Sequence, residues 1–218
     1  MDITPVPMQA DPVLPADPVL PAGSGRTKDY VAVDDVGAFT YYPSEAALIQ
    51  GFEYVQEAAC IVDRDGNTFG LTLDTDRRLR LGPSFGPVEF HWLRQAWSSE
   101  QRRHPRDHPL RRFYPAGQEA LLSGLFETLQ LEHGTDPTPV PWTLLLDGTE
   151  SHPSTLKDID GRLAHRDQLE HALVQDPFGH TYRPVRHGAR RPFAHAADLT
   201  CYYVEVSKPA DRRHPAAV

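Results

Sequence analysis

The chain has 218 residues, of which 39% are hydrophobic, and a formal net charge of −8. This length suits one sizeable domain with tails, and no run approaches the ~18 consecutive apolar residues of a membrane helix. The N-terminus also lacks the positive and apolar segments of a signal peptide. We therefore expect a soluble, cytoplasmic protein with no membrane partner.

Charge is distributed in blocks along the chain. Residues 31–76 carry nine acids and one base, 77–118 carry nine bases and three acids, and 119–160 carry eight acids and one base. Such blocks either neutralise one another within one fold or present separate acidic and basic faces to partners. A protein that coats nucleic acid would be more basic, so nucleic acid is not the expected partner.

The first 29 residues differ in composition from the remainder. ADPVLP occurs twice in tandem, at 10–15 and 16–21. Proline at this density prevents helix and sheet pairing and favours an extended conformation. We expect a disordered leader over 1–29, acting as a spacer, with a docking peptide as the alternative. A disordered tail is expected over 208–218.

Helices and strands are expected to mix without a repeating βαβ order. Helices are indicated where apolar residues recur every three or four positions, and strands where apolar and polar residues alternate. In chain order these patterns predict strands within 31–42, a helix at 43–55, a hairpin at 57–74, a strand at 78–81, helices at 87–103 and 117–134, a strand at 142–148, a loop at 149–162, a helix at 165–174, and strands at 181–187 and 197–206. The predicted fold class is α+β: a single domain over 30–207, with an antiparallel sheet packed against three to four helices.

Two of these predictions have the strongest local signals. The hairpin is centred on a turn at residues 65–67, of sequence DGN, which favours a tight reversal. The helix at 117–134 carries a broad apolar stripe and stops at Gly134. Cys60 and Cys201 each lie in strand-like apolar sequence, so we expect two buried thiols, with a disulfide as the alternative.

Residues 89–115 are the most unusual stretch, with two of the three tryptophans and six arginines between acidic neighbours. Tryptophan and arginine are typical of binding hot spots. The prolines at 105 and 109 exclude a helix there, and we expect the second half of the stretch to be an exposed basic loop. The principal hypothesis is a non-catalytic protein-binding protein, an inhibitor or accessory subunit, with one contact surface: Trp92, Arg94, Trp97, Arg102, Arg103, Arg111 and Arg112.

The alternative is a small metal-independent enzyme acting on a phosphorylated or nucleotide substrate. Histidine and tyrosine are frequent with arginine in residues 165–187, including His180 and Tyr182. Histidine could move a proton while arginine stabilises developing charge. The catalytic candidates are His165, Asp167, His171, Arg183, Arg186 and His187. Motifs for nucleotide, zinc or nucleophile chemistry are absent from the sequence, so neither a cofactor nor a metal is expected. In general shape, the order of helix, acidic hairpin and basic helix resembles small bacterial accessory and inhibitor proteins.

Overall fold

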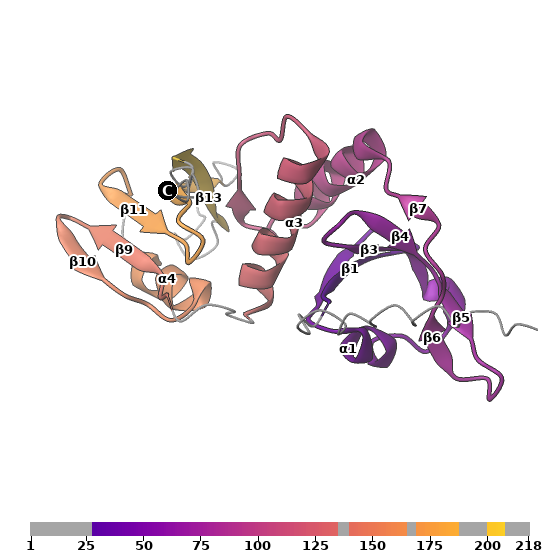
Figure 1. The fold of residues 1–218 in the computed structure, drawn as a ribbon. Coiled ribbons are helices and arrows are strands. Elements are labelled where there is room, and N and C mark those ends of the chain that lie inside the picture. The colour runs from indigo at the N-terminus through magenta and orange to yellow at the C-terminus, as the bar shows by residue number, and fades with distance from the viewer. Residues whose placement is uncertain (1–27, 135–139, 165–168, 188–199, 208–218) are drawn as a thin grey trace, which may run out of the picture.

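A computed structural model describes residues 28–134, 140–164, 169–187 and 200–207 (Figure 1). Over these residues the chain is a mixed α+β structure with four α-helices, which confirms the predicted class. Three sheets are present rather than the single one expected, with five, six and two strands. The predicted tail, and the predicted leader up to residue 27, lie outside the described residues.

The five-stranded sheet is built from the first part of the described chain. Its four strand pairs are all antiparallel. Two of them, β1–β2 and β3–β4, are hairpins joined by short turns, which is possible only for antiparallel strands. The predicted hairpin is confirmed as the β3–β4 pair only up to Phe69, because Leu71–Leu73 pairs with another strand in a separate sheet. The Asp63 carboxylate accepts a hydrogen bond from the Asn67 backbone N–H across the turn (2.8 Å). In spatial order its strands are β2 (Phe39–Tyr42), β1 (Tyr30–Asp34), β3 (Ala58–Asp63), β4 (Asn67–Phe69) and β7 (Gly86–Pro87).

One face of this sheet is covered by small elements. These are α1 (Glu45–Gln50), a 3₁₀ turn (Val55–Glu57) and the two-stranded sheet β5 (Leu71–Leu73) with β6 (Leu79–Leu81). Helix α1 is shorter than the predicted 43–55 helix and ends at Gly51, a poor helix former packed against the Tyr42 ring. Phe52 and Val55 still pack against the same buried cluster.

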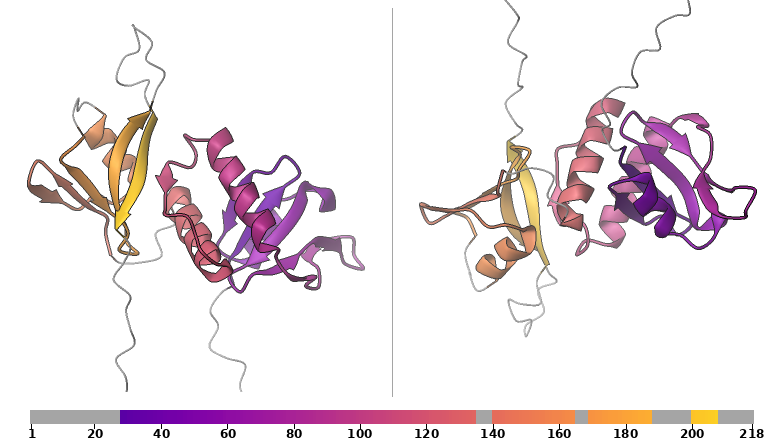
Figure 2. Two further views of the ribbon diagram at one scale, coloured as in Figure 1. Left: turned by 90° about the horizontal axis from the view of Figure 1, so that it is seen from above. Right: turned by 60° about the horizontal axis from the view of Figure 1, so that its bottom comes forward.

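The opposite face packs against α2 (Phe90–Arg103) and α3 (Gln118–His133). Both helices match the predicted segments. The apolar stripe of α3 is buried against β1 and β2, and Gly134 ends the helix with a left-handed backbone (φ 74°). Leu131 belongs instead to the core of the other large sheet. Helix α3 therefore lies between the two larger sheets (Figures 1 and 2).

The six-stranded sheet is formed mainly by the last part of the chain. Its order is β10 (Thr149–Ser151), β9 (Thr143–Leu146), β11 (Ala172–Gln175), β12 (Thr181–His187), β13 (Thr200–Ser207) and β8 (Leu110–Arg111). All its pairs are antiparallel except β13–β8, which is parallel. Helix α4 (Leu156–Leu163) covers one face. Strand β8 comes from between α2 and α3, so the middle of the chain supplies the edge of the C-terminal sheet.

Two sequence predictions in this region are wrong. The expected loop at 149–162 contains β10 and α4, because Thr155 and Asp158 form a capping box that starts the helix. The expected helix at 165–174 is a strand in its described end: Ala172 and Val174 alternate into the core between β9 and β12. Tertiary pairing has overridden a helix-like spacing of leucines.

Among the described residues, no helix is long and apolar enough to cross a membrane.

Candidate functional site

The predicted contact residues on α2 divide between core and surface. Trp97 is buried, with its ring 5.3 Å from Phe39 and 4.9 Å from His108 between centroids. Trp92 is 42% exposed. Arg102 is exposed and bonds Ser99 on its own helix. Trp97 thus acts in packing, while Trp92 and Arg102 are accessible.

The other predicted arginines are engaged within the fold. Arg103 donates to the carbonyl oxygens of Val36 and Gly37, which ties the end of α2 to the β1–β2 turn. Arg111 donates to the carbonyl oxygen of Gln101 and lies 5.1 Å from the centre of the Tyr202 ring. These contacts join elements that are distant in the sequence.

The proline-containing loop after α2 is non-helical, as predicted, but it is not exposed throughout. His108 is buried, with Nδ1 2.8 Å from Glu132 and Nε2 3.7 Å from Glu100. Burial raises the pKa of Glu132 against the opposing effect of His108. Leu110 is also buried, because β8 pairs with β13. The expectation of an exposed loop is therefore wrong at 108–110, where the chain crosses to the C-terminal sheet.

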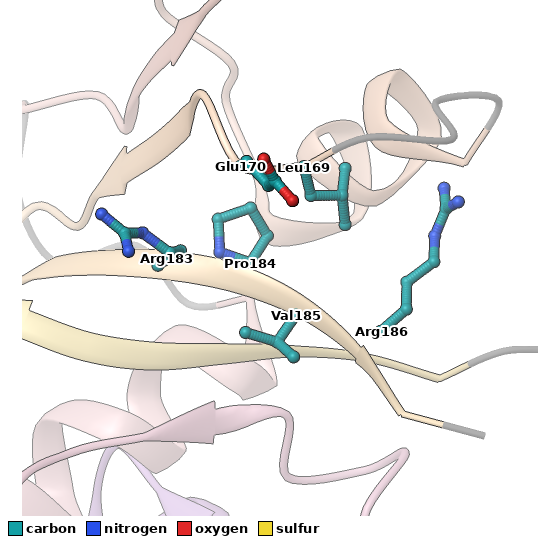
Figure 3. A pocket seen from close by; sticks show the side chains of 6 residues that line it. All are labelled: Leu169, Glu170, Arg183, Pro184, Val185 and Arg186. Atoms are coloured by element: carbon teal, nitrogen blue, oxygen red, sulfur yellow. The ribbon is translucent and has the colours of Figure 1, made fainter. Parts of the chain in front are cut away.

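The catalytic candidates of the alternative hypothesis do not come together in the described structure. His165 and Asp167 lie outside the described residues, and His171 is exposed on the turn before β11. Arg183 and Arg186 line a hollow of about 240 Å³, where their guanidinium groups lie at opposite ends (Figure 3). Arg186 donates to the carbonyl oxygens of Leu163 and Ala164 and so caps the end of α4. His187 is in β12, and its side chain lies outside the description.

A larger cavity, here called the junction cavity, lies where α2 and α3 meet the C-terminal sheet. Its volume of about 640 Å³ is within the roughly 300–1,000 Å³ of ligand pockets. Both apolar and polar residues form its walls, with a modest excess of apolar surface, and Phe113 (46% exposed) and Tyr114 (65% exposed) are among its lining residues. It is bounded by α2, α3, the segment that joins β8 to α3, and the turn between β11 and β12.

The polar part of this cavity is a cluster around Arg112, whose side chain is only 10% exposed. Arg112 uses all three of its nitrogens: Nε donates to the Tyr182 hydroxyl (2.9 Å), Nη2 to Asp176 (2.8 Å) and Nη1 to Glu127. Ser123 also donates to Glu127 (2.9 Å). Arg112 thereby links α3 to β12 and to the β11–β12 turn.

His180 completes this arrangement, here called the junction cluster. Its Nδ1 lies 2.6 Å from Glu205 on β13, and its Nε2 lies 3.3 Å from Glu127 on α3. The Asp176 carboxylate holds the turn that carries His180 by accepting from the backbone N–H groups of Phe178 and His180 (both 2.9 Å). The junction cluster therefore joins groups from five places: Arg112, Glu127, Asp176 with His180, Tyr182 and Glu205.

The ionisation of the junction cluster follows from these contacts. Burial opposes charge on His180, but its bonds to Glu127 and Glu205 outweigh burial and raise its pKa. Burial likewise opposes charge on Glu127, yet His180 and Arg112 lower its pKa to about 2. Glu205 also has a lowered pKa despite burial, owing to His180 and the Phe113 N–H. These contacts therefore favour the protonated form of His180 between the two carboxylates.

This arrangement limits what His180 can do chemically. A general acid–base histidine needs one ring nitrogen directed at the substrate, whereas both nitrogens of His180 face protein carboxylates. The structure describes no group of three or more histidine, cysteine or acidic side chains placed to hold a metal ion. The geometry of the junction cluster thus favours a structural role beside the junction cavity.

His180 and Tyr182 belong to the histidine-rich stretch at 165–187 but are not among the predicted site residues. Glu127, Asp176 and Glu205 were not predicted either. The one local signal was the DPFGH turn at 176–180, in which an aspartate precedes a glycine in a tight reversal (Gly179, φ 92°). Cys60 and Cys201 are free, partly buried thiols in different sheets.

Comparisons of this chain with protein-family models, curated proteins and solved structures found no match. Protein binding and a bacterial origin therefore remain predictions, and function has to be inferred from the geometry.

Proposed function

We propose that this chain is a non-catalytic protein-binding protein, an inhibitor or an accessory subunit, and that the junction cavity receives a side chain of its partner. The observation that carries the proposal is a large cavity with exposed aromatic residues beside the junction cluster, whose polar groups are already paired with one another. Buried pockets flanked by aromatic and arginine side chains are where binding energy concentrates in protein interfaces.

The pairing of polar groups within the junction cluster supports binding over catalysis. Arg112 and His180 have their nitrogens paired with groups of the protein itself, so a ligand would not have to compete for them. What the cavity offers to a partner is apolar area, aromatic rings and Arg94. The proposed contact surface therefore keeps Arg94 from the sequence prediction and adds Phe113 and Tyr114, whereas Trp92 and Arg102 are exposed but do not line the cavity.

Gly124 provides a direct test, because it lines the cavity in the middle of α3 and has open space where a Cβ atom would lie. Gly124→Trp should fill the cavity without a backbone clash. Gly124→Ala should leave the cavity open, and helix propensity predicts a small gain in stability of about 0.5–1 kcal/mol. Gly161→Trp is a matched control, since Gly161 is an equally open glycine in α4, outside this cavity.

The assay is photo-cross-linking in the cells that normally produce the protein, with p-benzoylphenylalanine in place of Tyr114. Tyr54, 58% exposed and outside the junction cavity, is the control position. We expect a discrete adduct from position 114 that disappears with Gly124→Trp and persists with Gly124→Ala and Gly161→Trp. An adduct pattern unaffected by Gly124→Trp, or no adduct at position 114, would refute docking at this cavity.

A further inference from the structure

Arg94 differs from the other charged residues that line the junction cavity. Its guanidinium carbon lies 3.7 Å from the centre of the Tyr114 ring and 5.6 Å from that of Phe90. Stacking of this kind occupies the flat faces of a guanidinium and leaves its edge of N–H donors available. The rings of Phe90, in α2, and Tyr114, in the segment between β8 and α3, therefore fix the orientation of the Arg94 guanidinium.

The donors of Arg94 are not used within the described structure. Its Nε is buried without a hydrogen-bond partner, and no ion pair joins Arg94 to another described residue. Buried donors in folded proteins are almost always paired. The neighbouring Arg112, in contrast, has two carboxylate partners. Arg94 therefore lacks a hydrogen-bond acceptor, which would have to come from outside the described residues.

The carboxylates near the cavity are not paired with Arg94. Glu127, Glu205 and Asp176 face Arg112 and His180 instead, and none of them forms an ion pair with Arg94. Arg94 therefore has no anionic partner among the described residues. A carboxylate suits the planar fork of a guanidinium, because it accepts two parallel hydrogen bonds.

The walls beside Arg94 restrict what can carry that carboxylate. Trp97, Leu121 and Leu125 lie in its walls but are almost fully buried, so its accessible apolar surface comes mainly from Phe113, Tyr114 and Phe178. We infer that the occupant is a segment of a partner protein in which an aspartate or glutamate adjoins a large apolar residue: the apolar side chain fills the cavity and the carboxylate binds Arg94. This inference rests on the proposed function and specifies the partner's chemistry.

Capped dipeptides test the inference on the full chain. The probes are acetyl-phenylalanyl-aspartyl amide and its asparagine analogue, which differ only in the carboxylate, titrated by protein-observed NMR. We expect the aspartate probe to bind about tenfold more tightly or better, because a hydrogen bond to a charged group adds that much. Arg94→Gln should bring the two affinities together by weakening only the aspartate probe, and Gly124→Trp should abolish binding of both.

Three results would overturn the inference. Equal binding of both probes to the wild-type chain, with loss in Gly124→Trp, would leave docking at the cavity intact but remove the carboxylate preference. Tighter, Arg94-dependent binding of phenyl phosphate would assign the guanidinium to phosphate instead. Failure of both dipeptides to bind at millimolar concentration would refute the stated occupant, while the adduct at position 114 separately decides whether the cavity docks a partner at all.

Discussion

Replacing Arg112 by methionine tests whether the junction cluster holds the C-terminal sheet to α3. Methionine retains much of the side-chain length but removes the charge and all the donors. Asp176, whose side chain is fully buried, would then lose its cation, and Glu127 would retain only His180. Removing one partner of a buried ion pair destabilises a protein by about 3–5 kcal/mol. At roughly 2–4 °C per kcal/mol for a chain of this size, Tm should fall by about 6–20 °C.

The measurement is urea unfolding followed by circular dichroism, with thermal unfolding in parallel. Arg102→Met is the matched control: Arg102 is exposed and bonds only Ser99 among the described residues, so its loss should change stability by less than about 0.5 kcal/mol. Arg112→Met combined with Asp176→Asn should be less harmful than the sum of the two changes, because the variants share one interaction. A loss below about 1 kcal/mol for Arg112→Met would refute the view that this cluster is a main tie between the sheets.

Further predictions concern pH, packing and backbone. Because the pKa of His180 is raised, its contribution to stability should be complete below about 6.5 and be lost as pH rises through the folded-state value. The pKa of Glu127 is lowered to about 2, so its contribution should be present above about 4.5 and be lost as pH falls toward 2. Urea midpoints across pH should decline on both sides, and His180→Gln should flatten the alkaline decline. Leu131→Ala should cost about 2–5 kcal/mol in urea unfolding, since Leu131 is buried in the C-terminal core; a change below about 1 kcal/mol would contradict that placement. Gly134→Ala should cost about 1 kcal/mol in thermal unfolding through its left-handed backbone alone, with Gly134→Asn milder, and equal effects of the two would speak against this cause.

Local signals predicted the elements that local interactions decide. The β3–β4 hairpin follows from its turn, and α3 follows from an apolar stripe that ends at Gly134. Strand β11 could not be predicted in this way, because a leucine-rich segment becomes a strand only when β9 and β12 lie on either side. The short helix α4 has a readable start in Thr155 and Asp158, which the sequence analysis overlooked.

The site was harder to predict because its contacts are distant in sequence. Arg112 was selected as an exposed contact residue, yet its partners Tyr182 and Asp176 lie 70 and 64 residues away. The same residue type in the same basic stretch has three outcomes: Arg94 stacks on rings, Arg103 binds carbonyl oxygens, and Arg112 is buried among carboxylates. Charge patterning alone does not distinguish these environments.

The position of β8 also has a consequence for the order in which this protein is made. Phe113, which follows β8, bonds Glu205 of β13 across 92 residues. At roughly 5–20 residues per second, a ribosome needs about 5–18 s between these two points. During that interval β8 has no β13 to pair with, and Glu205 is absent from the growing chain. A growing chain should therefore complete its N-terminal core before it has a junction cavity. Only a chain extended past Glu205 would contain all the residues that line this cavity.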